Sequence, residues 1–451
     1  MDSAALLIRN VLYPLWTVRN RSHRLSDLAA LRESQYWPAE RIRAEQFAQF
    51  TRMVRYAYEQ CDFYRRKYDA AGFNPAELRD MADVARVPCI TKTEIQQFGP
   101  EMIARDKRGS KDLLADMTGG STGSPLRFFY DNRRLDSRIA ATLRHNEWAG
   151  WDLGGRAAVL WGAPRDIIAS DFKSRVRSWI LERRLVLDAS SLTEESMRSF
   201  ARKLANYRPE VLLAYANTLG LFARFVEAEG IKLPSPRGVI TSAEVLTPEN
   251  RTLIERVLGT KVYDRYGSRE FAVIASECDR HSGMHVNAEN LLVEITGEAP
   301  GESGEIAITD LKNFAMPMIR YMTRDHGRMS GQACACGRGL PLIQLTGGRT
   351  TDFLHGSNGR RVSGIVLATY VITNNKGIGQ VQFVQSQHGR IQVNVVKSPA
   401  WSEESTADLL RKAANFLGAD MIFDVVYLAS IPHEKSGKYR FSICSLDETR
   451  K

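Results

Sequence analysis

The amino-acid sequence predicts an α/β protein: a large N-terminal α/β unit that includes a β-rich subdomain, followed by a small C-terminal α+β unit. Three observations carry this prediction. Apolar strands and amphipathic helices alternate between residues 156 and 267, which is the pattern of a mostly parallel sheet. After Gly283 the apolar runs become shorter and are separated by turn residues. A second alternation begins after residue 364, beyond a stretch rich in glycine and charge.

The stretch from about residue 26 to residue 108 is predicted to be helical. Apolar residues recur at helical spacing between residues 26 and 108, most clearly over 40–72, a run that ends at Gly72. The alternating region that follows contains buried strands, expected over residues 156–164, 210–216, 238–244 and 261–267. Helices are expected between them, over residues 193–207, 218–230 and 248–259.

The β-rich part and the C-terminal unit complete the predicted order. Short strands are expected over residues 291–296, 304–311 and 316–323. The C-terminal unit is predicted to contain two strands, a helix and a further strand, over residues 378–386, 390–398, 402–418 and 423–432. A unit of this size is typical of a separate domain. We therefore expect two domains, residues 1–348 and 349–451.

Composition narrows the class of protein. The chain has 451 residues, 43% of them hydrophobic and 25% charged, as in ordinary soluble proteins. No apolar run is long enough for a transmembrane segment, and the first residues lack the order of a signal peptide, so we expect a cytoplasmic protein. The net charge of +10 would also fit nucleic acid, but no basic motif interleaved with aromatic residues supports that partner. The basic stretch around Trp179 is interpreted as a solvated helix face, with peripheral membrane contact as the alternative.

A loop rich in glycine and hydroxyl groups, "TGGSTGSP", precedes a predicted strand. Such a loop is either a solvent-exposed turn or an anion cradle, because glycine lets backbone N–H groups approach a phosphate while serine and threonine add hydroxyl donors. It is not a Walker A loop, since Gly123 is followed by Ser124 and not by lysine.

Five further polar stretches follow this loop, several of them at the ends of predicted strands, where open α/β sheets bind ligands. They are "TSAE", "YDRYGSRE", "RYMTRDHG", "GGRTTDF" and "HEKSGKYRF". In this order they resemble the adenylate-forming superfamily, and within it the branch of phenylacetate–CoA ligases and CapK-like proteins. The resemblance extends from about residue 32 to residue 441. It implies the fold of those enzymes, with a mobile C-terminal domain.

The resemblance also implies roles for individual residues. A lysine near the C-terminus, Lys438, would be catalytic, and Glu270 would act in catalysis and hold Mg²⁺. Asp325 would bind the ribose hydroxyls and Tyr266 would stack near adenine, while Asp352 would be the hinge. The full set of expected ATP and AMP contacts is Thr118, Gly119, Gly120, Ser121, Thr122, Gly123, Glu244, Tyr266, Gly267, Asp325 and Arg349. Glu244 has an alternative interpretation as an N-terminal charge of the helix that begins at Pro248.

Three positions depart from the usual pattern of the family. Ser124 stands where relatives more often have a lysine, Arg269 replaces threonine or serine, and Arg324 replaces glycine. We expect the two arginines either to supply the missing positive charge or to mark an altered acyl site.

Cysteine and histidine residues predict a metal site. Cys334 and Cys336 form a Cys-x-Cys about fifty residues after Cys278, and in a cytosolic chain such a set favours zinc over a disulfide. His281 and His285 compete for the fourth position, and the resemblance favours His285. Reduced thiols in surface loops are the alternative. A structural zinc ion would hold the β-rich subdomain, expected over residues 272–345.

The predicted function is ATP-dependent activation of a small carboxylic acid as acyl-AMP. The acyl group would then pass to a thiol, of CoA or of a carrier protein, or to an amine. ATP, Mg²⁺ and a structural Zn²⁺ are the expected cofactors, with CoA as a further candidate. A link to surface-polysaccharide synthesis is a further implication of the resemblance. The alternative is a catalytically altered CapK-like binding or assembly protein of that pathway, a hypothesis motivated by Ser124, Arg269 and Arg324.

Overall fold

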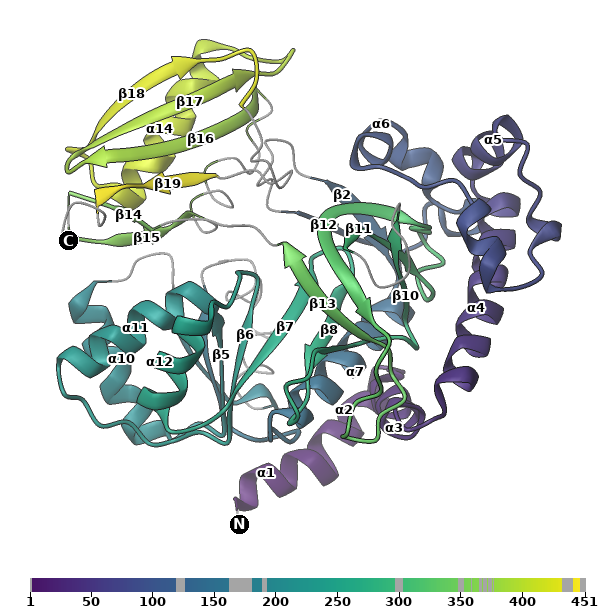
Figure 1. Ribbon diagram of the computed structural model, residues 1–451, viewed down its shortest axis with the longest axis horizontal. Coiled ribbons are helices and arrows are strands. Elements are labelled where there is room, and N and C mark those ends of the chain that lie inside the picture. Colours follow the sequence, from purple (N-terminus) through teal and green to yellow (C-terminus); the bar gives the residue numbers. More distant parts are fainter. Residues whose placement is uncertain are drawn as a thin grey trace.

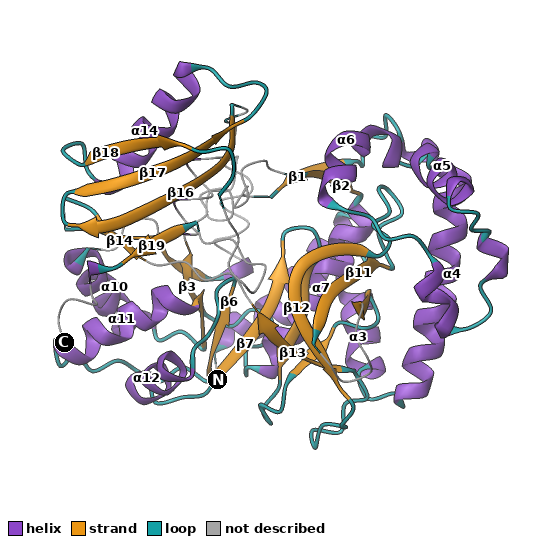
Figure 2. Cartoon of the chain, turned by 45° about the horizontal axis from the view of Figure 1, so that its top comes forward, coloured by secondary structure: helices purple, strands orange, loops and turns teal. Residues whose placement is uncertain are grey.

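The computed structural model contains a large unit that carries one long sheet and a small C-terminal unit beside it (Figures 1 and 2). It describes residues 2–118, 126–161, 181–188, 193–296, 303–347, 353–357, 359–364, 367, 371, 375, 377–431 and 441–446. The basic stretch around Trp179 and the predicted domain boundary at 348/349 lie outside these residues. The predicted fold class is confirmed.

Helices form the N-terminal part. They are α1 (Ser3–Leu7), a π-helical segment η1 (Ile8–Leu12), α2 (Tyr13–Arg19), α3 (Arg24–Ser34), α4 (Ala39–Gln60), α5 (Asp62–Ala70) and α6 (Lys92–Met102). The helical run predicted over 40–72 is divided into two helices, because Cys61 adopts an extended conformation with φ −119° and ψ 120° and separates α4 from α5. Periodicity continues across such a break, so the sequence pattern does not reveal it.

Eleven strands form one sheet in the order β10-β11-β12-β13-β9-β8-β7-β6-β5-β3-β4. Neighbours from β7 to β4 are parallel, and neighbours from β7 to β10 are antiparallel. The predicted β-rich part is therefore continuous with the parallel sheet. The parallel strands are β3 (Ala157–Trp161), β4 (Arg184–Asp188), β5 (Val211–Tyr215), β6 (Gly238–Ser242) and β7 (Val262–Ser268).

Helices cover both faces of the parallel half (Figure 1). On one face, α10 (Glu194–Tyr207), α11 (Ala216–Ala228) and α12 (Pro248–Leu258) pack through apolar side chains such as Phe200, Phe222 and Ile254 against Leu160 and Leu212. On the other face, α7 (Asn132–Trp148) and the N-terminal helices pack against the alternate strand residues Ala157, Val211 and Ile240. Parallel strands buried on both faces are expected to be apolar throughout, and the central strands β3 and β5 are.

The antiparallel half consists of shorter strands. They are β8 (Ala272–Glu277), β9 (Met284–Val286), β10 (Leu291–Thr296), β11 (Gly304–Asp310), β12 (Tyr321–Ser330) and β13 (Leu342–Gly347). The strand predicted over 316–323 is wrong for its first part. Met316, Met318 and Ile319 are buried in the core without strand pairing, and β12 begins only after Arg320, whose φ is +52°.

The C-terminal unit has a sheet and a hydrophobic core of its own. Its strands β16 (Ile378–Gln387), β17 (Arg390–Lys397), β18 (Ile422–Tyr427) and β19 (Ser442–Cys444) are ordered β18-β17-β16-β19, and α14 (Glu403–Leu417) packs on them. A separate hairpin is formed by β14 (Phe353–His355) and β15 (Arg361–Ser363). The two strands, the helix and the further strand predicted for this unit are present, but the strand expected over 423–432 ends at Tyr427. The strands β14, β15 and β19 were not predicted. None of the helices that the structure describes is long and apolar enough to cross a bilayer.

Candidate functional site

Two residues expected to contact the nucleotide are hydrogen-bonded to each other. The Tyr266 hydroxyl on β7 donates to Oδ2 of Asp325 on β12 over 2.8 Å. Three strands separate β7 from β12 in the sheet order, so the sheet must curl to bring the two side chains together. Tyr266 is buried and Asp325 is half-buried. The pair thereby joins the "YDRYGSRE" stretch to the "RYMTRDHG" stretch.

A second contact joins the turn that follows β7 to the strand that precedes the glycine-rich loop. Arg269, in the turn that follows β7, lies 3.8 Å from the Asp116 carboxylate on β1 (Leu114–Met117). Its carbonyl oxygen also accepts a hydrogen bond from Arg138 on α7. Asp116 and Arg138 were not predicted to lie near the site, because neither belongs to a recognisable motif. The positive charge of Arg269 is thus partly balanced by Asp116, which limits what it can supply to an anion.

Thr118 closes the stem of the glycine-rich loop. Its N–H donates to the Leu126 carbonyl over 2.9 Å, and its Oγ1 accepts from the Leu126 N–H over 2.8 Å. These bonds extend the pairing of β1 with β2 (Arg127–Tyr130). The Thr118 hydroxyl therefore has a structural role in the stem. Its expected phosphate contact stays a prediction.

Glu244 lies just beyond β6 and is buried. Its Oε2 accepts a hydrogen bond of 2.7 Å from the backbone N–H of Asn217, in the first turn of α11. A carboxylate at this position satisfies a free N–H and interacts favourably with the helix dipole. The alternative interpretation expected this charge ahead of the helix that begins at Pro248, but the carboxylate lies at the N-terminus of α11 instead. The contact of Glu244 with adenine stays a prediction.

Gly267 and Glu270 lie around the β7–β8 turn. A Cβ atom on Gly267 would approach the Ala272 carbonyl oxygen to 2.6 Å, so pairing of the two strands requires glycine at this position. Glu270 is half-buried in the turn, and its carboxylate is the kind of oxygen ligand that Mg²⁺ prefers. Its role as a magnesium ligand stays a prediction.

Two arginines of the "RYMTRDHG" stretch have different surroundings. The guanidinium of Arg320 is buried and donates to Glu294 and to the carbonyls of Ala85 and Val87, which makes it a structural anchor. Arg324 is exposed and has a φ of +65°. Its side chain is the more accessible of the two for an anionic ligand.

The expected zinc ligands come together. One ligand atom from each of Cys278, His285, Cys334 and Cys336 lies within 4.8 Å of the other three. The sulfurs of Cys278 and Cys334 are 3.7 Å apart, and Cys336 Sγ is 3.2 Å from His285 Nε2. Two thiolates bound to one tetrahedral zinc ion lie about 3.8 Å apart, so the residues fit this metal.

The chemistry of the donor set agrees with this fit. His285 has a pKa lowered to about 4 by burial, so its imidazole is neutral at pH 7, and its Nδ1 lies 3.3 Å from the Leu340 carbonyl. Burial raises the pKa of Cys278 to about 12, so a thiolate there needs a neighbouring cation. His281 is not a member of the cluster, because its Nδ1 is 3.2 Å from the Glu277 carboxylate. The choice of His285 over His281 agrees with this arrangement.

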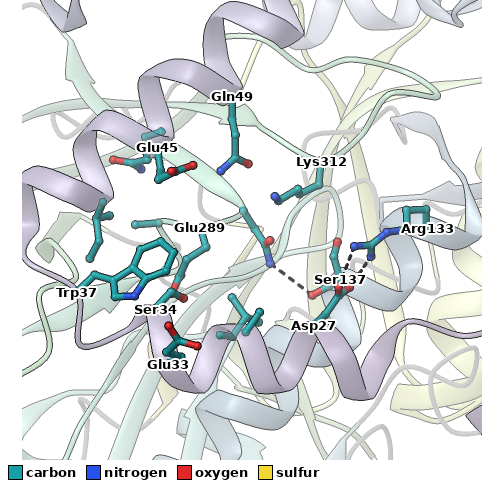
Figure 3. Close-up of a pocket in the computed structure, with 16 residues that line it drawn as sticks. Asp27, Glu33, Ser34, Trp37, Glu45, Gln49, Arg133, Ser137, Glu289 and Lys312 are labelled. Atoms are coloured by element: carbon teal, nitrogen blue, oxygen red, sulfur yellow. Dashed lines mark hydrogen bonds and ion pairs between the residues drawn. The ribbon is translucent and has the colours of Figure 1, made fainter.

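A cavity of about 220 Å³ lies between α3, α4 and α7 (Figure 3). Its lining, as far as the structure describes it, includes none of the expected nucleotide or zinc residues. Lys312 and Gln49 approach it from one side and Glu289 from another. Oε2 of Glu289 and Oε1 of Gln49 are buried without a hydrogen-bond partner among the described residues. Sequence patterns did not indicate this cavity.

Several expected site residues lie outside the described residues. They are Gly119, Gly120, Ser121, Thr122, Gly123, Ser124, Arg349, Asp352 and Lys438. Their roles stay predictions.

Comparisons with known proteins identify relatives of the chain. Residues 354–445 match the CapK C-terminal domain family. A phenylacetate–coenzyme A ligase of Thermus thermophilus is 28% identical over 339 residues, which is 71% of this chain and 73% of the relative. Protein CapK of Staphylococcus aureus is 24% identical over 439 residues, 94% of this chain and 93% of CapK.

The chain is a homologue of the phenylacetate–CoA ligases and of CapK. Among solved structures, a 2-hydroxyisobutyryl-CoA ligase in the postadenylation state has a TM-score of 0.59 at 18% identity, over 93% of each chain. A second structure of the same ligase, with 2-HIB-AMP and CoA in the thioesterification state, gives the same TM-score. The fold is therefore that of adenylate-forming CoA ligases, and the recognition of this homology from sequence is confirmed.

Proposed function

We propose that this protein is an adenylate-forming ligase that activates a carboxylic acid with ATP and passes the acyl group to a thiol, with that of CoA as the first candidate. The observation that most supports this proposal is the convergence of three predicted motifs. Tyr266 contacts Asp325, and Arg269 contacts Asp116 beside the stem of the glycine-rich loop. Homology to phenylacetate–CoA ligases supports the same chemistry.

Two half-reactions make up the proposed activity. The substrate carboxylate attacks the α-phosphorus of ATP and pyrophosphate leaves; a thiolate then attacks the acyl carbon and AMP leaves. Negative charge develops on phosphorus in the first step, so preorganised donors and cations are needed there. The backbone N–H groups of Gly119–Gly123 and the ammonium of Lys438 are proposed as those donors, Glu270 as the ligand of Mg²⁺, and Asp325 as the acceptor from the ribose.

Pyrophosphate exchange tests the proposal directly. Purified protein is incubated with ATP, Mg²⁺, labelled pyrophosphate and a panel of aromatic, aliphatic and hydroxylated acids. Exchange that depends on one class of acid supports adenylation and names the substrate class. Addition of CoA, a carrier-protein thiol or an amine then identifies the acceptor from the product.

A second candidate function is supported by the relation to CapK, which extends over almost the whole chain. In this case the protein would bind a nucleotide or acyl group in surface-polysaccharide synthesis without activating an acid. The replacement of lysine by Ser124 and the partial balance of Arg269 by Asp116 favour this candidate. Measurable ATP binding without exchange on any acid of the panel would select it.

We also propose that Cys278, His285, Cys334 and Cys336 hold a structural zinc ion. Four protein ligands leave no position for water, so the ion would cross-link the chain without taking part in catalysis. Cys278 follows β8, His285 lies on β9, and the two other cysteines precede β13. The ion would therefore hold together the segments at the centre of the antiparallel half.

A further inference from the structure

The N-terminal helical segment has apolar side chains on two opposite sides. From α1 through η1 to α2 the backbone is continuously helical over residues 3–19. Ile8 and Tyr13 are buried in the core that the segment shares with α3 and α7, and Ala5 is also buried. Leu7, Val11, Leu15 and Val18 are exposed by 50%, 42%, 63% and 77%. The segment therefore packs one apolar side on the body and leaves a second apolar side uncovered.

The exposed residues form one stripe. Their spacings of four, four and three residues place them on the same face of a helix. We define the N-terminal stripe as Leu7, Val11, Leu15 and Val18. With Leu6, this short segment holds five of the twelve large hydrophobic residues that are exposed in the described chain. Exposed apolar side chains are common singly, but a concentration of this kind marks an interaction surface.

The packed side of the segment holds the stripe in place. Arg9 donates to the Leu153 carbonyl over 3.1 Å and pairs with Asp152 over 3.1 Å. Just beyond the segment, Arg24 at the start of α3 pairs with Asp136 over 2.8 Å. The contacts of Arg9 in the middle of the segment and of Arg24 after it fix the segment on the body. In Figure 1, α1 lies at the edge of the large unit that is far from the C-terminal unit, so the stripe is remote from the candidate site.

Charge identifies the kind of partner. Residues 3–24 contain no acidic residue. Arg19 and Arg21, which follow the stripe directly, are exposed and form no ion pair within the described part of the chain. An apolar stripe beside unpaired arginines is the composition of a helix that lies in the interface of an anionic bilayer, with its apolar side chains among the lipids and its cations at the phosphates.

A second copy of the chain fits this surface less well. Each copy carries a net charge of +10, so contact through the stripe brings like charges together. A stable dimer interface also needs about 20–30 residues from each partner, and the stripe supplies four.

We propose that the N-terminal stripe, with Arg19 and Arg21, attaches this protein to the surface of anionic membranes. The attachment is peripheral and reversible, because four partly exposed side chains bury little apolar surface. It would hold the large unit at the bilayer. The proposal does not depend on the proposed ligase activity.

Vesicle flotation of the full-length protein tests the proposal. Wild-type protein is expected to float with vesicles that contain phosphatidylglycerol and phosphatidylcholine, at least roughly tenfold more than with phosphatidylcholine alone, and to be released by high salt. The double variant Leu15→Glu/Val18→Glu and the double variant Arg19→Glu/Arg21→Glu should each reduce flotation about tenfold or more. Ile422→Glu, which adds the same charge at an exposed aliphatic residue on β18, should float like the wild type.

Thermal unfolding of each variant shows whether it is folded. Flotation of a folded Leu15→Glu/Val18→Glu variant at the wild-type level would overturn the proposal. Equal flotation of the wild type with neutral and anionic vesicles would overturn it as well. Light scattering tests whether a second copy of the chain binds the stripe. If the wild type were a dimer, the Leu15→Glu/Val18→Glu variant a monomer, and neither floated with vesicles, the stripe would serve self-association and the membrane proposal would be rejected.

Discussion

The Tyr266 hydroxyl donates a hydrogen bond of 2.8 Å to the Asp325 carboxylate, across the curled half of the sheet. The bond orients one carboxylate oxygen of Asp325 and leaves the other oxygen for a ligand. Both residues were predicted from the sequence to contact the nucleotide. The hydrogen bond couples these two roles: Asp325 would bind the ribose, and Tyr266 would hold the Asp325 carboxylate in position.

We expect the two residues to differ in the size of their effect on ATP. Asp325→Ala removes a charged acceptor and should raise KM for ATP about 10- to 100-fold, whereas Tyr266→Phe removes one neutral donor and should raise it about 2- to 10-fold. Steady-state exchange kinetics measure both. Tyr56→Phe removes the hydroxyl of another Tyr–Asp pair, with Asp106, and should leave KM unchanged. An Asp325→Ala variant with wild-type KM would contradict the assignment.

Lys438 should be needed for adenylation. Loss of one preorganised cation at a transition state costs about 10²-fold or more, so Lys438→Ala should lower pyrophosphate exchange by at least that factor. Lys412→Ala, a change at a lysine on α14 of the same unit that pairs with Asp408, is the matched control. Exchange at the wild-type rate in Lys438→Ala would rule out this role.

Zinc should be retained by the purified protein at about one ion per chain. Cys336→Ser should lose the ion and lower the melting temperature by roughly 5 °C or more, because the cross-link between neighbouring segments is lost. Metal analysis and thermal unfolding measure the two effects. Cys89→Ser, at a cysteine outside the cluster, and His281→Ala should keep the ion. Zinc retained in His285→Ala but lost in His281→Ala would move the fourth ligand to His281.

The contribution of Asp264 to the stability of the fold should decrease as the pH rises from about 4 to 6. Burial raises the pKa of Asp264 to about 6, against an ordinary value of 3.8, so the folded state binds a proton more tightly than the unfolded state does. The contribution of Asp264 to the free energy of unfolding is therefore fully present below the pKa that this residue has in the unfolded chain. This contribution is lost as the pH rises through the pKa in the folded state, by about 3 kcal/mol at most.

Asp264→Asn should flatten this dependence in urea unfolding between pH 4 and pH 7, because the amide does not titrate and can still accept from Thr241. Asp69→Asn, at an exposed carboxylate on α5, should leave the slope unchanged. A slope that persists in Asp264→Asn would assign the titration to another group.

The sequence predicted the features that depend on local pattern or on residue chemistry. The strands β3, β5, β6 and β7 and the helices between them have strong periodicity, and the Cys/His set needed only the number and kind of its ligands. The edge strand β4, which has polar residues at both ends, was not predicted. Features that depend on tertiary contacts were missed. The extended conformation of Cys61 does not interrupt the apolar pattern, and the buried run before Tyr321 has the composition of a strand without its pairing. The approach of Arg269 to Asp116 joins segments more than 150 residues apart.

The small C-terminal unit buries its apolar residues in a cluster that shares no member with the clusters of the large unit, among the residues that the structure describes. Substitutions in one core therefore need no compensating change in the other. Descendants of a common ancestor can keep a C-terminal unit like that of CapK while the large unit diverges toward a new acid. The two halves of the molecule are thus free to evolve at different rates and to be exchanged between lineages by recombination.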